Sequence, residues 1–332
     1  MPTDDIDVPV LHLKAQEFYA NGLAASTKST YSAGQLRFTS FCQGFKVPPL
    51  PATESTLILF ASYLATLNIS HTTIKVYLSA LRHMHVSAGM YTIFNNQLTP
   101  RLQLTLKGIQ KSQAFTQPPR IQLPITLQIM ESVKALLSNQ PHSYFNIMIW
   151  AACCLAFFGF LRVSEFTIPA DDQYDESCHL SFNSVSVDSR DNPQQLRISI
   201  KQSKTDPFRK GVDMFLRATG DNICPVRGIL PYLAARGDHK GPLFVFKDGR
   251  SLTHLRFSTA LNSLLQQLHI DPRFYNTHSF HIGVATSARQ ANIPDTFIKM
   301  MGRWKNDAYQ SYIKTPPQEL AKLSKYLTSG YP

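Results

Sequence analysis

The residues best suited to chemistry lie near the C-terminal end, from Tyr275 to Lys314, which reads YNTHSFHIGVATSARQANIPDTFIKMMGRWKNDAYQSYIK. His278 and His281 are three residues apart, which places both on one face of a helix. Trp304 follows, and Tyr312 comes eight residues after it. A histidine can transfer a proton or bind a phosphate oxygen, an indole can donate a hydrogen bond, and a tyrosine can act as a nucleophile. This order of residues predicts a catalytic site.

Other residues offer the cation and the proton donor needed to break a phosphodiester bond without a metal. Arg162 stands at the end of an apolar run, and its planar guanidinium can bind two phosphate oxygens at once. Lys204 lies in a predicted hairpin turn, where it could protonate a leaving oxygen, and Lys201 is the alternative. Tyr309, one helical turn before Tyr312, is the alternative nucleophile.

Neither a metal nor another cofactor is predicted. No glutamate follows His278, so its pairing with His281 departs from the H-E-x-x-H pattern, and no third ligand is evident. The five cysteines form no CxxC pair and no even disulfide framework. That usage is typical of a reducing compartment and argues against a structural zinc.

The charge distribution predicts a polyanionic partner. The chain has 332 residues, a formal net charge of +11 and a pI near 9.4. No Asp or Glu occurs between Glu54 and Glu131, although this interval contains six basic residues. We expect a surface that follows DNA phosphates, with an ordinary solvated face as the alternative. The predicted DNA-binding residues are Lys75, Arg82, Lys107, Lys111, Lys201 and Arg303.

Hydrophobic periodicity predicts two domains joined by a proline-containing linker at residues 115–125. Residues 1–114 contain four or five amphipathic helices and no strand pattern, which indicates a small helical bundle. The helices are expected over 11–23, after a cap at Ser26-Thr27, from Thr53, around 74–88 and from Pro100.

Residues 126–332 are predicted to form an α+β domain that is mostly helix. Alternating side chains indicate strands at 196–201 and 212–216, joined by a basic hairpin loop, and a short strand at 243–246. Helices are expected from Thr126, over 144–161, over 225–235 and from Thr253 onward.

Two segments bear on the cellular location. The run from Tyr144 to Leu161 is uncharged and about long enough to span a bilayer, but it contains Asn146 and leads directly into Arg162. These polar residues favour a buried core helix. The N-terminal sequence MPTDDIDVPV lacks the charged-then-apolar order of a secretory signal, so we expect neither export nor membrane insertion.

Taken together, these motifs resemble the tyrosine recombinase (phage integrase-like) family, in which an H-x-x-R motif, a His or Trp after a glycine, and a nucleophilic tyrosine occur in this order. The resemblance covers nearly the whole chain. It is closest in look to recombinases of eukaryotic DIRS, Ngaro and Crypton mobile elements, where runs like HSFRIGAAT and GRWKSDAYxRYIR are characteristic. Arg162 matches the family's first arginine, and Lys204 matches its hairpin lysine.

The resemblance implies a helical core-binding (SAM-like) domain and a catalytic domain with a small antiparallel sheet, which together close around double-stranded DNA. Tyr312 would form a 3′-phosphotyrosyl intermediate. Arg162, His278 and Trp304 would stabilise the transition state, and Lys204 would protonate the leaving 5′ oxygen. Synapsis would require a homotetramer, and the eukaryotic likeness implies a nuclear location for this integrase of a mobile element.

One position departs from the family pattern, because His281 stands where the family has its second arginine. An arginine would add a bidentate clamp, whereas a histidine offers one donor and is charged only when protonated. Losing a donor to a developing oxyanion costs roughly 10²–10³ in rate. Two functions are therefore weighed: an active recombinase, or a recombinase-derived DNA-binding protein without catalysis. A helical protein-binding module would require all the motif positions to be coincidence.

Overall fold

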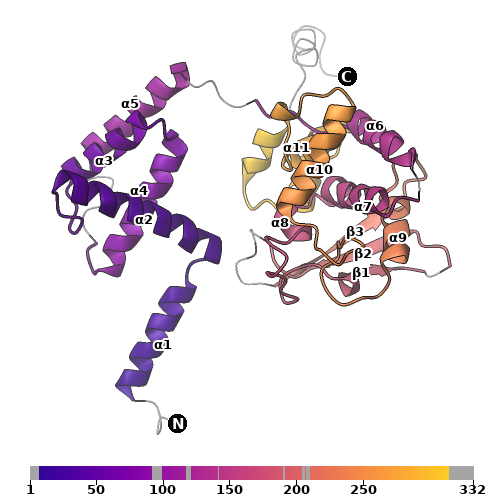
Figure 1. Ribbon diagram of the computed structural model, residues 1–332, viewed down its shortest axis with the longest axis horizontal. Helices are drawn as coiled ribbons and strands as arrows, with labels where there is room; N and C mark the ends of the chain where they lie inside the picture. The colour runs from indigo at the N-terminus through magenta and orange to yellow at the C-terminus, as the bar shows by residue number, and fades with distance from the viewer. Residues whose placement is uncertain are drawn as a thin grey trace. The chain divides into compact units, whose positions relative to one another are not determined.

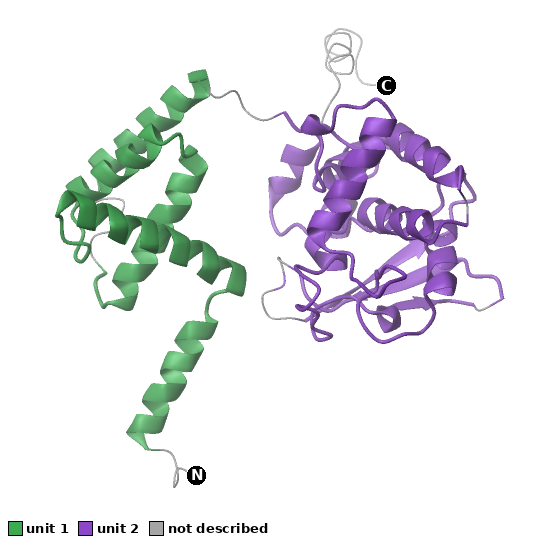
Figure 2. Ribbon diagram, viewed as in Figure 1, with its two compact units in different colours: residues 1–119 green, residues 120–332 purple. Residues whose placement is uncertain are grey.

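The computed structural model describes residues 7–91, 99–116, 121–140, 142–189, 191–203, 206 and 210–313. The chain divides into two compact units, residues 1–119 and 120–332 (Figure 2). This division falls within the predicted linker, residues 115–125. Each unit has its own cluster of buried apolar side chains, which is what a separately folding domain requires.

Unit 1 is helical throughout its described part (Figure 1). The side chains of Leu57, Phe60 and Leu64 recur every three or four residues, which places them on one buried face of the third helix. Phe38 packs edge-on against Phe60 at a centroid distance of 5.1 Å in the core. The helices are α1 (Val8–Asn21), α2 (Ala25–Phe45), α3 (Glu54–Thr66), α4 (His71–Ser87) and α5 (Pro100–Thr116).

The helix starts in unit 1 agree only partly with prediction. Thr53 caps α3 as expected, since its side chain accepts a hydrogen bond from the backbone N–H of Thr56. The predicted cap at Ser26-Thr27 is wrong, because α2 begins at Ala25 and has no side-chain cap. The high helix propensity of alanine extends the helix past the serine. Glu54, which begins the acid-free interval, accepts a hydrogen bond from the backbone of Leu102 at 3.0 Å and caps α5.

Unit 2 is built around α7 (Tyr144–Phe158), in which every residue from Met148 to Phe157 is buried. Helix α9 (Pro225–Arg236) packs against it, and the close approach depends on Gly228. A Cβ atom at that position would lie 2.5 Å from the sulfur of Cys154. The prediction of a core helix is confirmed, and within the described ranges no helix is long and apolar enough to cross a membrane.

The remaining helices of unit 2 are short. Thr126 and Thr253 cap the helices that follow them through side-chain oxygens, as the sequence predicts. These elements are α6 (Leu127–Ser138), α8 (Val163–Phe166), α10 (His254–Gln267), α11 (Ser279–Gln290) and α12 (Asp295–Met301), with the 3-10 turns η1 (Phe182–Ser184), η2 (Pro272–Phe274) and η3 (Asp307–Tyr312).

A three-stranded antiparallel sheet completes unit 2, in the order β1 (Val185–Val187), β2 (Gln195–Ile200) and β3 (Val212–Arg217). This confirms the predicted fold class, a mainly helical protein with a small antiparallel sheet. Strand β1 was not predicted, because three residues are too few to show alternation. The predicted strand at 243–246 is wrong, since this segment makes only an isolated bridge, between Val245 and Ser251.

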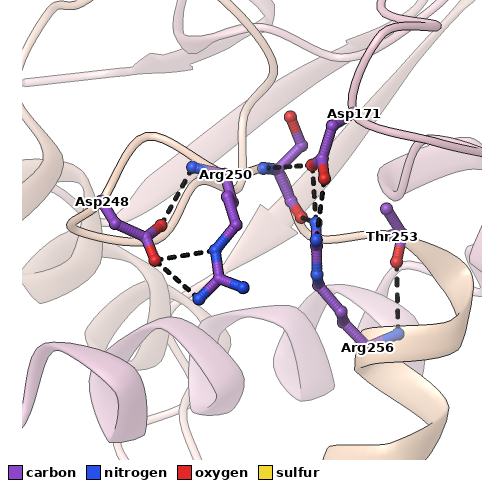
Figure 3. Close-up of polar contacts among 6 residues, drawn as sticks. Asp171, Asp248, Arg250, Thr253 and Arg256 are labelled. Atoms are coloured by element: carbon purple, nitrogen blue, oxygen red, sulfur yellow. Dashed lines mark hydrogen bonds and ion pairs between the residues drawn. The ribbon is translucent and has the colours of Figure 1, made fainter.

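Polar contacts fasten the segment after α8 to the start of α10 (Figure 3). Arg256 donates to both carboxylate oxygens of Asp171, at 2.5 and 2.7 Å, and the backbone N–H of Ser251 donates to the same carboxylate at 2.9 Å. Ile168 forms a parallel bridge with Thr253 close by. The chain on the C-terminal side of α8 is therefore held in place, which limits how far α8 can shift.

Candidate active site

Unit 2 contains a cleft of about 560 Å³. Its wall includes five of the six predicted catalytic residues, namely Arg162, His278, His281, Trp304 and Tyr312. The sixth, Lys204, lies outside the described residues. Segments that are far apart in the sequence thus meet at one place.

These side chains come from helix ends, where backbone groups and side chains can face a cleft. Arg162 is the N-cap residue of α8, and His278 is the N-cap residue of α11. Helix α11 is held against the chain before α6, because the backbone N–H of Ile125 donates to the carbonyl of Ser279 at 3.0 Å. The contact requires Gly283, since a Cβ there would lie 1.8 Å from the carbonyl oxygen of Ile125.

Glu165 organises the positive charge beside the cleft. One carboxylate oxygen accepts a hydrogen bond from the Arg162 guanidinium at 3.1 Å. The other accepts from the Arg162 backbone N–H at 2.9 Å and from the Arg303 guanidinium at 2.6 Å. Only 2% of the Glu165 side chain is exposed, so removing either arginine would leave a buried charge partly unpaired, a change that costs about 3–5 kcal/mol in buried pairs.

Arg303 is placed differently from its prediction as a DNA contact. Its side chain is 12% exposed and is paired with Glu165, and its guanidinium also donates to the carbonyl of Phe160 at 3.0 Å. Burial is the main cause that lowers the pKa of Arg303, and Glu165 opposes it. The guanidinium therefore connects the turn after α12 with the turn after α7 and faces protein acceptors, not solvent.

His281 is buried, with 1% of its surface exposed, and neither ring nitrogen has a side-chain or main-chain hydrogen-bond partner within the described residues. Burial lowers the pKa of His281 to about 3; the positive charges of His278 and Arg162 add to this effect, and the main chain of Leu161 weakly opposes it. The imidazole is therefore neutral at neutral pH. Its ring lies 6.0 Å from that of Trp304. His281 shares the place of the family's second arginine but not its charge.

Tyr312 is held in the cleft by ring contacts. Trp304 stacks on it at a centroid distance of 5.5 Å and an interplanar angle of 25°, and His278 meets it edge-on at 4.8 Å. Gly302 makes room for the indole, because a Cβ at that position would lie 1.8 Å from the Trp304 ring. Within the part of the chain that the structure describes, the Tyr312 hydroxyl makes no hydrogen bond, which suits a nucleophile that must meet its substrate.

Tyr309, the alternative nucleophile, lies outside the cleft wall. It is 4% exposed, and its hydroxyl donates a hydrogen bond to Asp295 at 3.0 Å. Its ring packs against Trp304 at 6.1 Å. Tyr309 therefore has a packing role, and the geometry favours Tyr312 as the reactive tyrosine.

The predicted DNA-binding lysines and arginine of unit 1 are exposed. Lys75 and Arg82 lie on α4, and Lys107 and Lys111 lie on α5. None of the four makes an ion pair with another described residue. Their contact with DNA stays a prediction.

Lys201 follows β2 and lines a second hollow, of about 440 Å³, together with Lys210. Its ammonium donates to the carbonyl of Glu176 at 2.6 Å. Because Lys204 is not described, the choice between Lys201 and Lys204 as the general acid stays open.

The cleft wall also contains residues that the sequence analysis did not select, including Thr277, Lys305 and Asn306. Lys305 directly follows Trp304 in the GRWK run, which was the available signal. No group of three or more His, Cys, Asp or Glu side chains in the described ranges could hold a metal ion.

Unit 2 thus combines a helical fold and a three-stranded sheet with a cleft that brings together a tyrosine, an arginine, two histidines and a tryptophan. A nucleophile beside a cation and proton-transfer groups suits the cleavage of a phosphodiester bond. No protein-family model matches the chain. Over 304 residues it is 24% identical to an integrase/recombinase xerD homolog of Selenomonas ruminantium, a match that spans 90% of this chain and 83% of that relative.

Solved structures show the same fold. XerH site-specific recombinase, in a post-cleavage complex with a palindromic difH substrate, matches with a TM-score of 0.65 and 13% identity over 90% of this chain and 79% of XerH. Tn1549 transposon integrase with circular intermediate DNA has a TM-score of 0.56 and 13% identity, over 95% of this chain and 98% of the integrase. A lambda integrase dimer bound to a COC′ core site has a TM-score of 0.54 and 12% identity, over 92% of this chain and 76% of the lambda integrase chain.

The chain is thus similar in sequence to an integrase/recombinase, and it has the fold of solved site-specific recombinases and integrases. The closer likeness to eukaryotic DIRS, Ngaro and Crypton recombinases stays a prediction.

Proposed function

We propose that this protein is a site-specific DNA recombinase or integrase that cuts and rejoins DNA through a 3′-phosphotyrosyl intermediate. The observation that carries the proposal is the placement of Tyr312 in one cleft with Arg162, His278 and Trp304. The relative's description as an integrase/recombinase, and the DNA complexes of the solved neighbours, support DNA as the substrate.

In the proposed reaction, the phenolic oxygen of Tyr312 forms a bond to phosphorus while the bond from phosphorus to the 5′ oxygen breaks. The phenol passes its proton to His278, whose ring lies 4.8 Å from the Tyr312 ring, and the leaving 5′ oxygen gains a proton from Lys204 or, alternatively, Lys201. Arg162 and Trp304 donate hydrogen bonds to the non-bridging oxygens, whose charge increases in the transition state. Rejoining is the reverse attack by a 5′ hydroxyl, so the phosphotyrosyl bond conserves the energy and no ATP is needed.

The remaining parts of the proposal concern assembly. Residues 1–114 serve as the core-binding domain, through Lys75, Arg82, Lys107 and Lys111, and residues 126–332 serve as the catalytic domain. The protein works as a homotetramer on synapsed DNA. It originates from a mobile element, which the likeness to a transposon integrase supports, and it acts in the nucleus.

Covalent capture tests the proposal. The parent protein and the variants Tyr312→Phe and Tyr309→Phe are incubated with plasmid and with a pool of nicked duplexes of random sequence, and the products are resolved on a denaturing gel. We expect a protein–DNA adduct from the parent and from Tyr309→Phe but not from Tyr312→Phe. An adduct that survives Tyr312→Phe would assign the nucleophile elsewhere.

A second function is favoured by one observation, the buried and neutral His281. In this alternative the protein binds DNA without cutting it. The same gel separates the two functions through the variant His281→Arg. If the parent gives no adduct and His281→Arg does, the protein is a recombinase-derived DNA-binding protein.

A further inference from the structure

The candidate active site has little positive charge to offer a phosphate. Arg162 and Arg303 share the carboxylate of Glu165, which leaves one net positive charge for the three groups. Arg303 also faces carbonyl groups inside the protein. His281 is neutral and buried. A phosphate under attack by Tyr312 needs cations beside its non-bridging oxygens, so a further positive side chain is required.

Lys305 is a cation in the cleft wall with no acidic partner. It is exposed, and it makes no hydrogen bond or ion pair with any residue that the structure describes. Two neighbouring basic residues differ in this respect. Lys299 is paired with Asp307 at 3.0 Å, and Arg289 is paired with Asp295 at 2.8 Å.

The backbone that carries Lys305 is fixed while its side chain is not. The N–H of Trp304 donates to the carbonyl of Lys299 at 3.0 Å, and the Trp304 ring is locked between Gly302 and Tyr312. A lysine on such a turn has a flexible stem of four carbons and a compact charge, so it can meet a phosphate that enters the cleft.

We propose that Lys305 contacts a non-bridging oxygen of the scissile phosphate and provides the positive charge that His281 does not. This inference rests on the proposed function and adds to it a catalytic residue. It also explains how an active site with histidine at position 281 can keep its activity, because Lys305 offers a positive charge from the exposed turn after Trp304.

The test is a double-mutant cycle. Lys305→Met is made in the parent and in His281→Arg, and the initial rate of the Tyr312-dependent adduct is measured on the pool of nicked random duplexes. Lys247→Met is the matched control, because Lys247 is exposed, lies over the ring of Tyr144 and is absent from the cleft wall. DNA affinity by fluorescence anisotropy and thermal melting are recorded for every variant.

We expect Lys305→Met to lower the adduct rate of the parent by roughly 10²–10³, the usual effect of losing one charged donor to a developing oxyanion. In His281→Arg, where an arginine is available, the loss should be less than about tenfold, because the two residues are coupled. Affinity and melting temperature should match those of Lys247→Met.

Three results would overturn the inference. In the first, Lys305→Met lowers the rate of adduct formation no more than Lys247→Met does. In the second, Lys305→Met lowers that rate by the same factor in the parent and in His281→Arg. In the third, only proteins that carry His281→Arg form an adduct. In the first two cases the parent still cuts DNA, so the proposed function stands and only the role of Lys305 fails. If no protein in the cycle forms an adduct with either substrate, the proposed function fails as well.

Discussion

Two tyrosines one turn apart differ in what their hydroxyl groups contact. The hydroxyl of Tyr309 donates a hydrogen bond to Asp295, whereas that of Tyr312, a residue of the cleft wall, makes none with the described residues. A hydrogen bond to a carboxylate contributes about 1.5–3 kcal/mol, and an exposed hydroxyl contributes little. We therefore expect Tyr309→Phe to lower the free energy of unfolding by about that amount, and Tyr312→Phe to change it by less than about 0.5 kcal/mol.

Urea unfolding followed by tryptophan fluorescence measures this difference. The signal reports on unit 2, because both tryptophans, Trp150 and Trp304, belong to it. The prediction fails if Tyr312→Phe is the more destabilising of the two changes.

His281 makes the stability of unit 2 depend on pH. Burial lowers its pKa to about 3, while an unfolded histidine titrates near 6.5, so the folded state binds fewer protons between these values. The contribution of His281 to the free energy of unfolding is therefore fully present above pH about 6.5 and is lost as the pH falls toward 3. Between these values the free energy of unfolding falls by about 1.4 kcal/mol per pH unit. The pH profile of urea unfolding should lose this slope in His281→Leu. An unchanged profile would show that the pKa of His281 is the same in the folded protein as in the unfolded chain.

Residue types and spacing were enough to predict five of the side chains that meet in the cleft, but not how they are charged there. The neutral state of His281 follows from its burial. The pairing of Arg303 depends on Glu165 and on the carbonyl of Phe160, which are far away in sequence. Such distant acceptors leave no local pattern, so an arginine in a basic run was predicted to contact DNA.

At the level of elements, the turn after α12 positions the tryptophan and the lysine of the site. Gly302 is essential to it, because a Cβ would lie 1.8 Å from the Trp304 ring and would displace it from Tyr312. We expect Gly302→Ala to lower the adduct rate by about 10²-fold, the usual effect of moving a group in the site by about 1 Å. Gly108→Ala is the control, since nothing lies within 4 Å of its added methyl and its adduct rate should stay unchanged. Equal rates for both variants would contradict the role of this turn.

Element boundaries were predictable where a local signal exists. The threonine caps at positions 53, 126 and 253 were expected and are observed. The start of α2 was not, because it lacks a side-chain cap. The segment 243–246 has strand-like side chains, but Leu243 donates to Leu180 and Phe244 accepts from Leu252, so its backbone partners lie in loops and not in the sheet.

At the level of the whole molecule, the proposed function assigns DNA binding mainly to unit 1 and the chemistry to unit 2. The cleft lies entirely within unit 2, whereas the acid-free interval lies mostly in unit 1. Hydrophobic periodicity was sufficient to anticipate two separate cores, since each contains local helical stripes. It does not predict contacts between the protein and DNA, which depend on exposed side chains.

The basic side chains of α5 allow a quantitative test of DNA binding by unit 1. Lys107 and Lys111 are one helical turn apart, exposed and without an acidic partner among the described residues. Each phosphate contact adds about 0.9 to the slope of log affinity against log salt on duplex DNA. If both lysines contact phosphates, the variant with Lys107→Ala and Lys111→Ala should lose about 1.8 from that slope. Fluorescence anisotropy over a salt series measures it without requiring a target site.

The control for this experiment is Lys14→Ala, because Lys14 is already paired with Glu17 at 2.8 Å on α1 and should not change the slope. The two α5 substitutions should also leave the adduct rate per bound protein unchanged, since the described cleft wall is made of unit 2 residues. A slope that stays at the parent value would mean that α5 presents an ordinary solvated face. DNA binding would then depend on unit 2, where Lys201 and Lys210 line the second hollow.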